Sequence, residues 1–239
     1  MPFVSVDNVQ LDYEIRGSGA PLVVYLHGHG MPSSIACRDV HPLLRDLGTC
    51  LSYDRPGVGA SGKPRAPQTG SANATTLRAV LGQLALPPPY VLVGHSSGGI
   101  YADFYARMFP DEVAGVAFVE SAHPAQLEAF KPRMSFAMRV QLWIATRNRN
   151  IEMASYADLQ YEKDYARPFP EIPIVVITGA KPDPRLLALM EPKLALQKEL
   201  AALSPKSTHL TSHESGHMIP HTEPQLVADA IRELCTAAG

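Results

Sequence analysis

A serine with the surroundings of a catalytic nucleophile lies near the middle of the chain, in the motif Gly94-His95-Ser96-Ser97-Gly98. The apolar run Tyr90–Val93 precedes this motif and a helical pattern follows it, which places Ser96 on a sharp turn between a strand and a helix. Glycines two residues before and after the serine allow such a turn without a clash. The amide of Ser97 then lies at the start of a helix, where the helix dipole stabilises an oxyanion. The motif therefore predicts covalent catalysis by Ser96, and Ser97 is the weaker candidate because it lacks symmetric glycines.

A second donor for the oxyanion is predicted in the loop after Leu22–Leu26, which has the sequence His27-Gly28-His29-Gly30. In acyl transfer by a serine on such a turn, a backbone N–H of that loop and the N–H that follows the nucleophile both donate to the oxyanion. We expect the N–H groups of His29 and Ser97 to form the oxyanion hole. A metal site built from His27, His29 and His41 is the competing interpretation, but no carboxylate or further ligand has a suitable spacing. We therefore expect no metal and no cofactor.

A serine nucleophile needs a base, and His217 is the best candidate among the nine histidines. It follows a predicted strand at 208–212 and precedes the last predicted helix, in the sequence Glu214-Ser215-Gly216-His217. The order nucleophile, acid, histidine along the chain accompanies this kind of nucleophile turn. His213, at the strand end, and His221, just before the last helix, are second choices.

The acid that orients the base has two candidates, Glu120 and Asp183. Glu120 directly follows the predicted strand 113–119, and a strand end positions a side chain rigidly. Its neighbours are apolar, and an unpaired carboxylate among them would be costly. Asp183 lies several residues into a loop that contains Pro182, where a turn or capping role also explains it. We favour Glu120 and keep Asp183 as the alternative acid.

The elements that must position these residues follow from the hydrophobic pattern. Residues 3–16 alternate around Asp7-Asn8, which predicts a hairpin. Short apolar runs that do not alternate are typical of strands buried on both faces of a parallel sheet, and they occur at 22–26, 50–53, 90–93, 113–119 and 174–178. Helical patterns lie at 33–47, 74–86, 98–108 and 186–203, and a last helix begins at a predicted capping box, Thr222-Glu223-Pro224-Gln225. This alternation predicts a doubly wound α/β sheet.

One segment, residues 122–170, interrupts the alternation and is too long for a crossover loop. It contains the only tryptophan, Trp143, and several Phe, Met and Tyr residues. We expect it to be a helical lid over the carboxyl ends of the strands, where ligands bind in such sheets. The core would then comprise residues 1–121 and 171–239. We expect Gly28, His95 and Trp143 to contact the substrate.

Composition and charge narrow the function classes. The chain has 239 residues, 46% of them hydrophobic, and a net charge of −2 with scattered basic residues. This balance predicts a globular protein that binds neither nucleic acid nor an acidic membrane surface. Three cysteines, at 37, 50 and 235, match no metal or redox spacing, and no signal peptide or membrane span is apparent, so we expect a cytoplasmic protein. The oligomeric state is not addressed by any of these features.

Together these motifs resemble the α/β-hydrolase superfamily, in its small-lid, esterase-like branch. The resemblance rests on His27-Gly28, the run Asp54–Ser61, Gly94–Gly98 and Gly216-His217, and it covers nearly the whole chain apart from the lid. It implies a mostly parallel eight-stranded sheet with helices on both faces and a small helical lid. Asp54–Ser61 looks like the loop after the fourth strand in that family, to which we assign a structural role. The Gly179–Asp183 segment departs from the usual family pattern, whereas some dehalogenases of this fold place their acid where Glu120 lies.

The expected reaction is the hydrolysis of a small, apolar carboxylic ester through an acyl-enzyme, with a small molecule as the only expected partner. Haloalkane dehalogenases and epoxide hydrolases of this fold carry aspartate as the nucleophile, so Ser96 argues against both. The motif also resembles hydroxynitrile lyases and small methyl esterases. Hydrolysis of a lactone, thioester, amide or C–C bond, and cyanohydrin cleavage, are therefore alternatives that use the same residues. A slow-turnover ligand receptor on the same fold is a further alternative.

Overall fold

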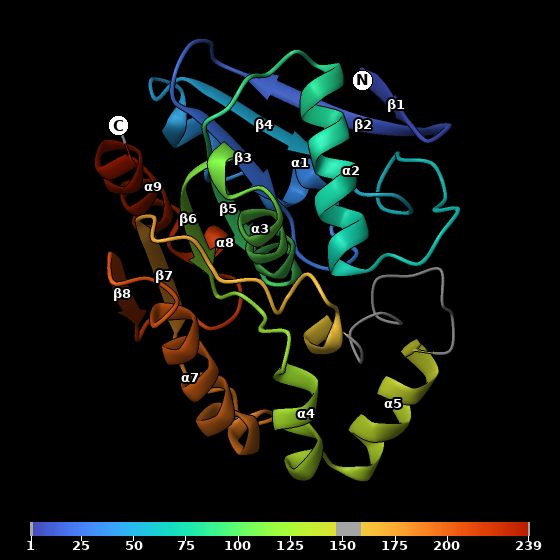
Figure 1. Cartoon of the computed structure of the whole chain (residues 1–239). Helices are drawn as coiled ribbons and strands as arrows, with labels where there is room; N and C mark the ends of the chain where they lie inside the picture. The colour runs from blue at the N-terminus through green and yellow to red at the C-terminus, as the bar shows by residue number, and fades with distance from the viewer. Residues whose placement is uncertain (1, 147–158, 239) are drawn as a thin grey trace.

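The computed structural model describes residues 2–146 and 159–238 and contains an eight-stranded sheet of order β1-β2-β4-β3-β5-β6-β7-β8 (Figure 1). The strands are β1 (Phe3–Val6), β2 (Val9–Arg16), β3 (Leu22–Leu26), β4 (Thr49–Tyr53), β5 (Tyr90–His95), β6 (Val113–Val119), β7 (Ile174–Gly179) and β8 (Ser207–Ser212). Pairing is antiparallel from β1 to β4 and parallel from β4 to β8. The predicted fold class is therefore confirmed.

The hairpin and the central strands form where the hydrophobic pattern places them. Val6 pairs with Val9, and the two residues between them, Asp7 and Asn8, have φ of 49° and 61°. Two left-handed residues in a two-residue loop match the twist of the flanking strands, and Asp and Asn tolerate this conformation. All residues of β3, β4, β5 and β7 are buried, because helices cover both faces of the parallel part of the sheet.

Two apolar cores lie on the two faces of the sheet. On one face, α2 (Gly70–Gln83) and α3 (Ser97–Met108) pack against the strands, and both helices cross in front of the sheet in Figure 1. On the other face lie α1 (Ser33–Ala36), the 3-10 turn His41–Leu44 and α9 (Pro224–Ala238). The helix α7 (Leu187–Ala201) packs against β7 and β8. This layering makes the sheet a rigid platform whose parallel strands end at one edge.

The structure differs from the predicted helices at two places. The pattern at 33–47 forms only the short α1 and the 3-10 turn, because Pro42 lies within it and Gly48 ends it. The last helix begins at Pro224, after a separate short helix α8 (Ile219–Thr222). Thr222 therefore ends α8 and does not cap α9, and Gln225, the residue that would close the capping box, donates to Asp229 instead.

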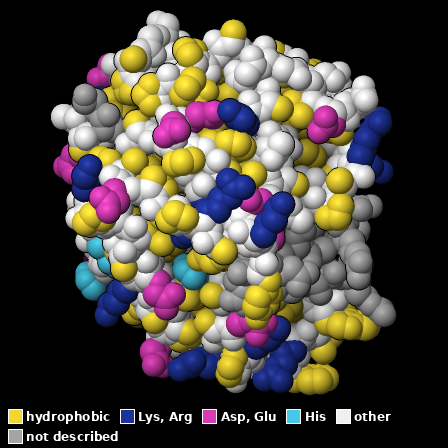
Figure 2. Space-filling view, viewed as in Figure 1, with side chains coloured by type: hydrophobic (Ala, Val, Ile, Leu, Met, Phe, Trp, Pro, Cys, Tyr) yellow, Lys and Arg dark blue, Asp and Glu magenta, His cyan; other side chains and the backbone are white. Residues whose placement is uncertain are grey.

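The segment between β6 and β7 contains α4 (Gln126–Phe130), a 3-10 turn at Lys131–Arg133, α5 (Phe136–Thr146) and a 3-10 turn at Leu159–Tyr161. Large apolar side chains of α5 are exposed, among them Phe136, Trp143 and Ile144. In Figure 2, apolar side chains accordingly reach the surface at the lower right, where Figure 1 places α5. Its role as a lid is a prediction. No helix among the described residues is long and apolar enough to span a membrane.

Candidate active site

The nucleophile motif forms a strained turn between β5 and α3. Ser96 has φ 54° and ψ −123°, a conformation that costs free energy in any residue with a side chain. A Cβ added to Gly94 would lie 2.4 Å from Gly99 Cα, and one added to Gly98 would lie 2.0 Å from the carbonyl oxygen of Leu26. Only glycine fits at both positions, which gives the spacing of the motif a direct physical cause.

The loop after β3 lies against this turn. A Cβ built on Gly28 would be 3.2 Å from Ser96 Cβ, so the chain from Gly28 to His29 passes directly beside the serine. Ser97 is the first residue of α3, and its amide has no acceptor one turn earlier within the helix. The two amides predicted to hold an oxyanion therefore belong to backbone segments that flank Ser96. Their function as an oxyanion hole stays a prediction.

Arg55, whose role the sequence did not suggest, holds this loop in place. Its buried guanidinium donates to the carbonyl oxygens of His27 (2.7 Å) and Gly28 (3.2 Å) and lies 4.7 Å from the centre of the Tyr101 ring. The His27 ring accepts from the Arg55 backbone N–H (3.2 Å) and bonds the Gly28 carbonyl (2.8 Å). His27 thus braces the loop. The only signal in the sequence was the motif Asp54–Ser61, to which a structural role was assigned.

His217 and Glu120 come together from separate loops at the same edge of the sheet. His217 Nδ1 lies 3.8 Å from Glu120 Oε1, and the His217 side chain is 56% exposed whereas that of Glu120 is 4% exposed. Glu120 follows β6 with φ 43°, a left-handed conformation for which a non-glycine residue needs support from its surroundings. Its Oε2 accepts from the Gly179 N–H (2.7 Å), and its Oε1 accepts from Lys193 Nζ (2.6 Å).

These contacts keep Glu120 ionised. Burial raises the pKa of the Glu120 carboxyl group, but the approach of His217, the Lys193 cation and the Gly179 N–H outweigh that cost and hold the pKa below its ordinary value. Asp183 has a different environment, since its carboxylate is bound by Arg185 at 2.7 and 3.0 Å and its side chain is 33% exposed. Of the two acid candidates, Glu120 is therefore the one that the structure places beside His217.

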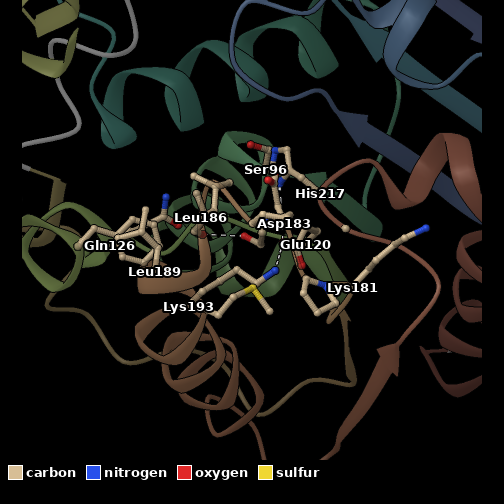
Figure 3. Close-up of a pocket in the computed structure, with 16 residues that line it drawn as sticks. Ser96, Glu120, Gln126, Lys181, Asp183, Leu186, Leu189, Lys193 and His217 are labelled. Atoms are coloured by element: carbon tan, nitrogen blue, oxygen red, sulfur yellow. Dashed lines mark hydrogen bonds and ion pairs between the residues drawn. The ribbon is translucent and has the colours of Figure 1, made fainter. Parts of the chain in front are cut away.

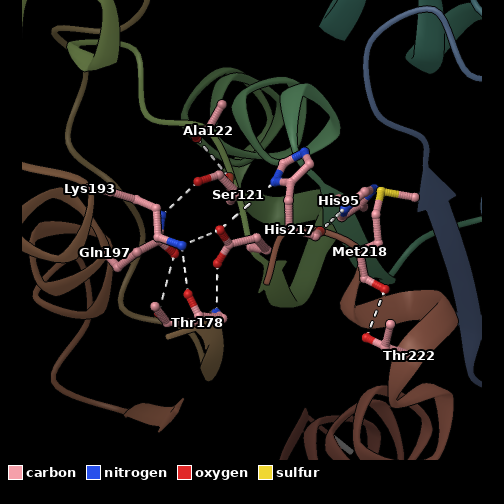
Figure 4. A network of polar contacts seen from close by, with 11 residues as sticks. His95, Ser121, Ala122, Thr178, Lys193, Gln197, His217, Met218 and Thr222 are labelled. Carbon is pink, nitrogen blue, oxygen red and sulfur yellow. Dashed lines mark hydrogen bonds and ion pairs between the residues drawn. The ribbon is translucent and has the colours of Figure 1, made fainter. Parts of the chain in front are cut away.

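His95 lies beside His217 (Figure 4). Its ring is buried 5.1 Å from the His217 ring, and its Nε2 lies 2.9 Å from the His217 carbonyl oxygen. Because a carbonyl only accepts, this nitrogen must be the donor, which leaves Nδ1 as the acceptor of a neutral ring. Burial lowers the pKa of His95 to about 4, which agrees with a neutral ring. His95 was expected to contact the substrate, but it is absent from the lining of the pocket at Ser96 and instead holds the His217 backbone.

A model of the alpha/beta hydrolase family matches residues 23–230. The chain belongs to this family. An uncharacterised protein of Bacillus subtilis, YqjL, is 24% identical over 228 residues, which cover 93% of this chain and 87% of the relative. A haloalkane dehalogenase of Bradyrhizobium diazoefficiens is 33% identical over 111 residues, but these cover 46% of this chain and only 35% of that enzyme. The solved enol-lactonase from Burkholderia xenovorans LB400 has a TM-score of 0.69 at 18% identity and covers 98% of this chain and 100% of its own, which shows the shared fold.

In this alpha/beta hydrolase, the triad candidates open onto a pocket of about 540 Å³ (Figure 3). Ser96, Glu120 and His217 line one side, and α4 and α7 supply apolar side chains on the other, namely Phe130, Leu189 and Met190 with Leu186 beside them. Trp143 does not line this pocket. It is 55% exposed on α5 and borders a separate hollow with Leu127 and Met134, so the expected substrate contact by Trp143 stays a prediction that this pocket does not support.

Among the described residues, no group of three or more His, Cys, Asp or Glu side chains is arranged to hold a metal ion. Of the three histidines considered as ligands, His27 braces the loop and His41 is buried against Tyr25, with ring centres 5.9 Å apart at an angle of 85°. The residues gathered at Ser96 are instead a serine, a histidine and a carboxylate, side chains of the kinds that acyl transfer uses.

Proposed function

We propose that the protein is a serine hydrolase that cleaves a small, apolar carboxylic ester through an acyl-enzyme intermediate. One observation carries this proposal: Ser96, His217 and Glu120 come from the turns after β5, β8 and β6 and line one pocket at the carboxyl edge of the sheet. Membership of the alpha/beta hydrolase family independently supports a hydrolytic activity.

The geometry supports the following sequence of steps. His217 removes the proton of the Ser96 hydroxyl, whose oxygen attacks the ester carbonyl carbon. The N–H groups of His29 and Ser97 stabilise the resulting oxyanion. His217 then protonates the leaving alcohol, and in the second half it activates a water molecule that releases the acid and restores Ser96. Glu120, buried and ionised, orients the His217 ring and stabilises its charged form during both steps.

The pocket favours an uncharged substrate of modest size. A volume of about 540 Å³ lies within the range of small-molecule sites, and most of the side chains that α4 and α7 contribute to its wall are apolar. The enol-lactonase to which the chain is structurally similar is named for a lactone, which is a cyclic ester, so lactone hydrolysis is the second candidate function. The dehalogenase relative suggests a carbon–halogen bond, but dehalogenases of this fold use aspartate where this chain has Ser96. The segment from 122 to 170 would act as the lid that sets substrate size.

A fluorophosphonate probe tests the nucleophile. We expect labelling of the wild-type protein at Ser96, loss of labelling and of ester turnover in Ser96→Ala, and retained labelling in Ser97→Ala, the matched change at the neighbouring serine. A folded wild-type protein that is not labelled would contradict the proposal and favour a ligand receptor. A panel of p-nitrophenyl esters, lactones and amides of increasing chain length then identifies the bond that is cleaved.

A further inference from the structure

Glu120 serves two partners through the same oxygen atom. Lys193 Nζ lies 2.6 Å from Glu120 Oε1, whereas His217 Nδ1 lies 3.8 Å from that atom. Lys193 Nζ also donates to the Gly179 carbonyl oxygen at 2.6 Å, so β7 and α7 together fix the position of the ammonium group (Figure 4). The Lys193 side chain is only 19% exposed, which limits how far water screens its charge.

We infer that Lys193 is a positioning residue that shares the Glu120 carboxylate with His217 and thereby sets the pH at which His217 acts as a base. This inference rests on the proposed function and names a residue of the same site. The ammonium group offsets part of the negative charge through which Glu120 would attract a proton to the His217 ring. It is also a second cation near that ring, so it disfavours the protonated imidazole. The cation therefore lessens the stabilisation that Glu120 gives to the protonated ring of His217.

Other charged groups near His217 do not replace Lys193 in this role. His95 packs beside the ring but is neutral, since burial lowers its pKa to about 4. On the β7–α7 loop, Asp183 is paired with Arg185, and on α8 His221 is paired with Asp39 at 2.6 Å. Lys181 lines the pocket from the same loop, but no contact joins it to Glu120 among the described interactions. Lys193 is therefore the cation whose removal leaves the Glu120 carboxylate without its ion-pair partner.

The test is the pH profile of kcat/KM for Lys193→Met. The acidic limb of this profile reports the pKa of the catalytic base in the free enzyme. A charge within about 4–6 Å shifts a pKa by about 1–3 units, and we expect the lower end, about one unit upward, because half of His217 faces water. Lys193→Arg keeps the cation and should restore the wild-type limb. Lys198→Met removes an exposed lysine from the same helix and should leave the limb unchanged.

An acidic limb that stays in place in folded Lys193→Met would overturn the inference, even if kcat falls, because that result describes a purely structural cation. If Lys193→Met does not fold, Lys193→Gln removes the charge while keeping a hydrogen-bond donor and carries the same test. The His217 pKa is also measured by NMR titration of ¹³C-labelled histidine, with His217→Gln for assignment. This titration does not depend on turnover, so failure of the ester hydrolase proposal and failure of the Lys193 inference give different results.

Discussion

The exchange Glu120→Gln tests the acid of the site most directly. Three donors face the Glu120 carboxylate: the Gly179 N–H at 2.7 Å, Lys193 Nζ at 2.6 Å and His217 Nδ1 at 3.8 Å. A glutamine side chain offers one acceptor oxygen and one NH₂ group in the same space. Whichever way the amide turns, its NH₂ group points at a donor, and Lys193 loses its ion-pair partner.

The expected loss can be estimated from these contacts. Replacing the carboxylate of a serine–histidine–acid triad by an amide lowers kcat by about 10⁴-fold when the acid is hydrogen-bonded to the histidine. The 3.8 Å separation here is longer than a hydrogen bond, so we expect about 10³-fold, equivalent to about 4 kcal/mol in the activation free energy. The donor left facing an NH₂ group should also lower the free energy of unfolding by about 1–3 kcal/mol.

The assay is kcat on a short p-nitrophenyl ester, together with urea unfolding of each variant. Asp183→Asn is the matched control, because Asp183 lines the same pocket but its carboxylate is bound to Arg185. We expect Asp183→Asn to change kcat by less than about threefold, as a residue outside the triad would. The reasoning is refuted if Asp183→Asn abolishes turnover while Glu120→Gln retains most of it.

Two further predictions concern stability. Gly98→Ala places a methyl group 2.0 Å from a β3 carbonyl oxygen and should lower the free energy of unfolding by about 3 kcal/mol or more. Gly82→Ala, in an exposed helical position with open space around it, should instead raise the free energy of unfolding by about 0.5–1 kcal/mol. Urea unfolding measures both, and equal effects of the two substitutions would contradict the clash at Gly98. Burial raises the pKa of Asp103 to about 6, so its protonation stabilises the fold fully below about pH 4, and this contribution is lost as the pH rises through 6. The stability of Asp103→Asn relative to wild type should therefore rise by up to about 3 kcal/mol between pH 4 and pH 7, and a flat difference would show that Arg107 fully offsets the burial of Asp103.

The features that were predictable from sequence are those with local causes. A two-residue turn at Asp7-Asn8, unbroken apolar strands and glycines around Ser96 each follow from contacts between residues close in the chain or from the burial of a whole strand. The helix expected at 33–47 was wrong for a local reason too, since Pro42 and Gly48 were given too little weight against the apolar pattern. The capping box expected at Thr222 does not form, because Thr222 ends the separate helix α8 and Gln225 donates to Asp229 within α9.

The order nucleophile, acid, histidine pointed to Ser96 and His217 but left Glu120 and Asp183 as competing acids. The choice between the two depended on which carboxylate meets His217. Strand order does not decide it, because β7, which precedes Asp183, lies between β6 and β8. The side-chain contacts decide it, since Arg185 holds Asp183 whereas Glu120 lies 3.8 Å from His217.

The amino-acid sequence was sufficient for the sheet, the nucleophile turn and the chain order of the candidate site, because hydrophobic periodicity and glycine spacing act over a few residues. It did not indicate that Arg55 braces the loop beside Ser96, that His95 holds the His217 backbone, or that Lys193 shares the Glu120 carboxylate. Each of these contacts joins residues at least 27 positions apart in the chain. A hydrogen bond or ion pair over that separation forms only when packing of the sheet and helices has brought both partners together. No pattern among residues close in the chain predicts such a contact.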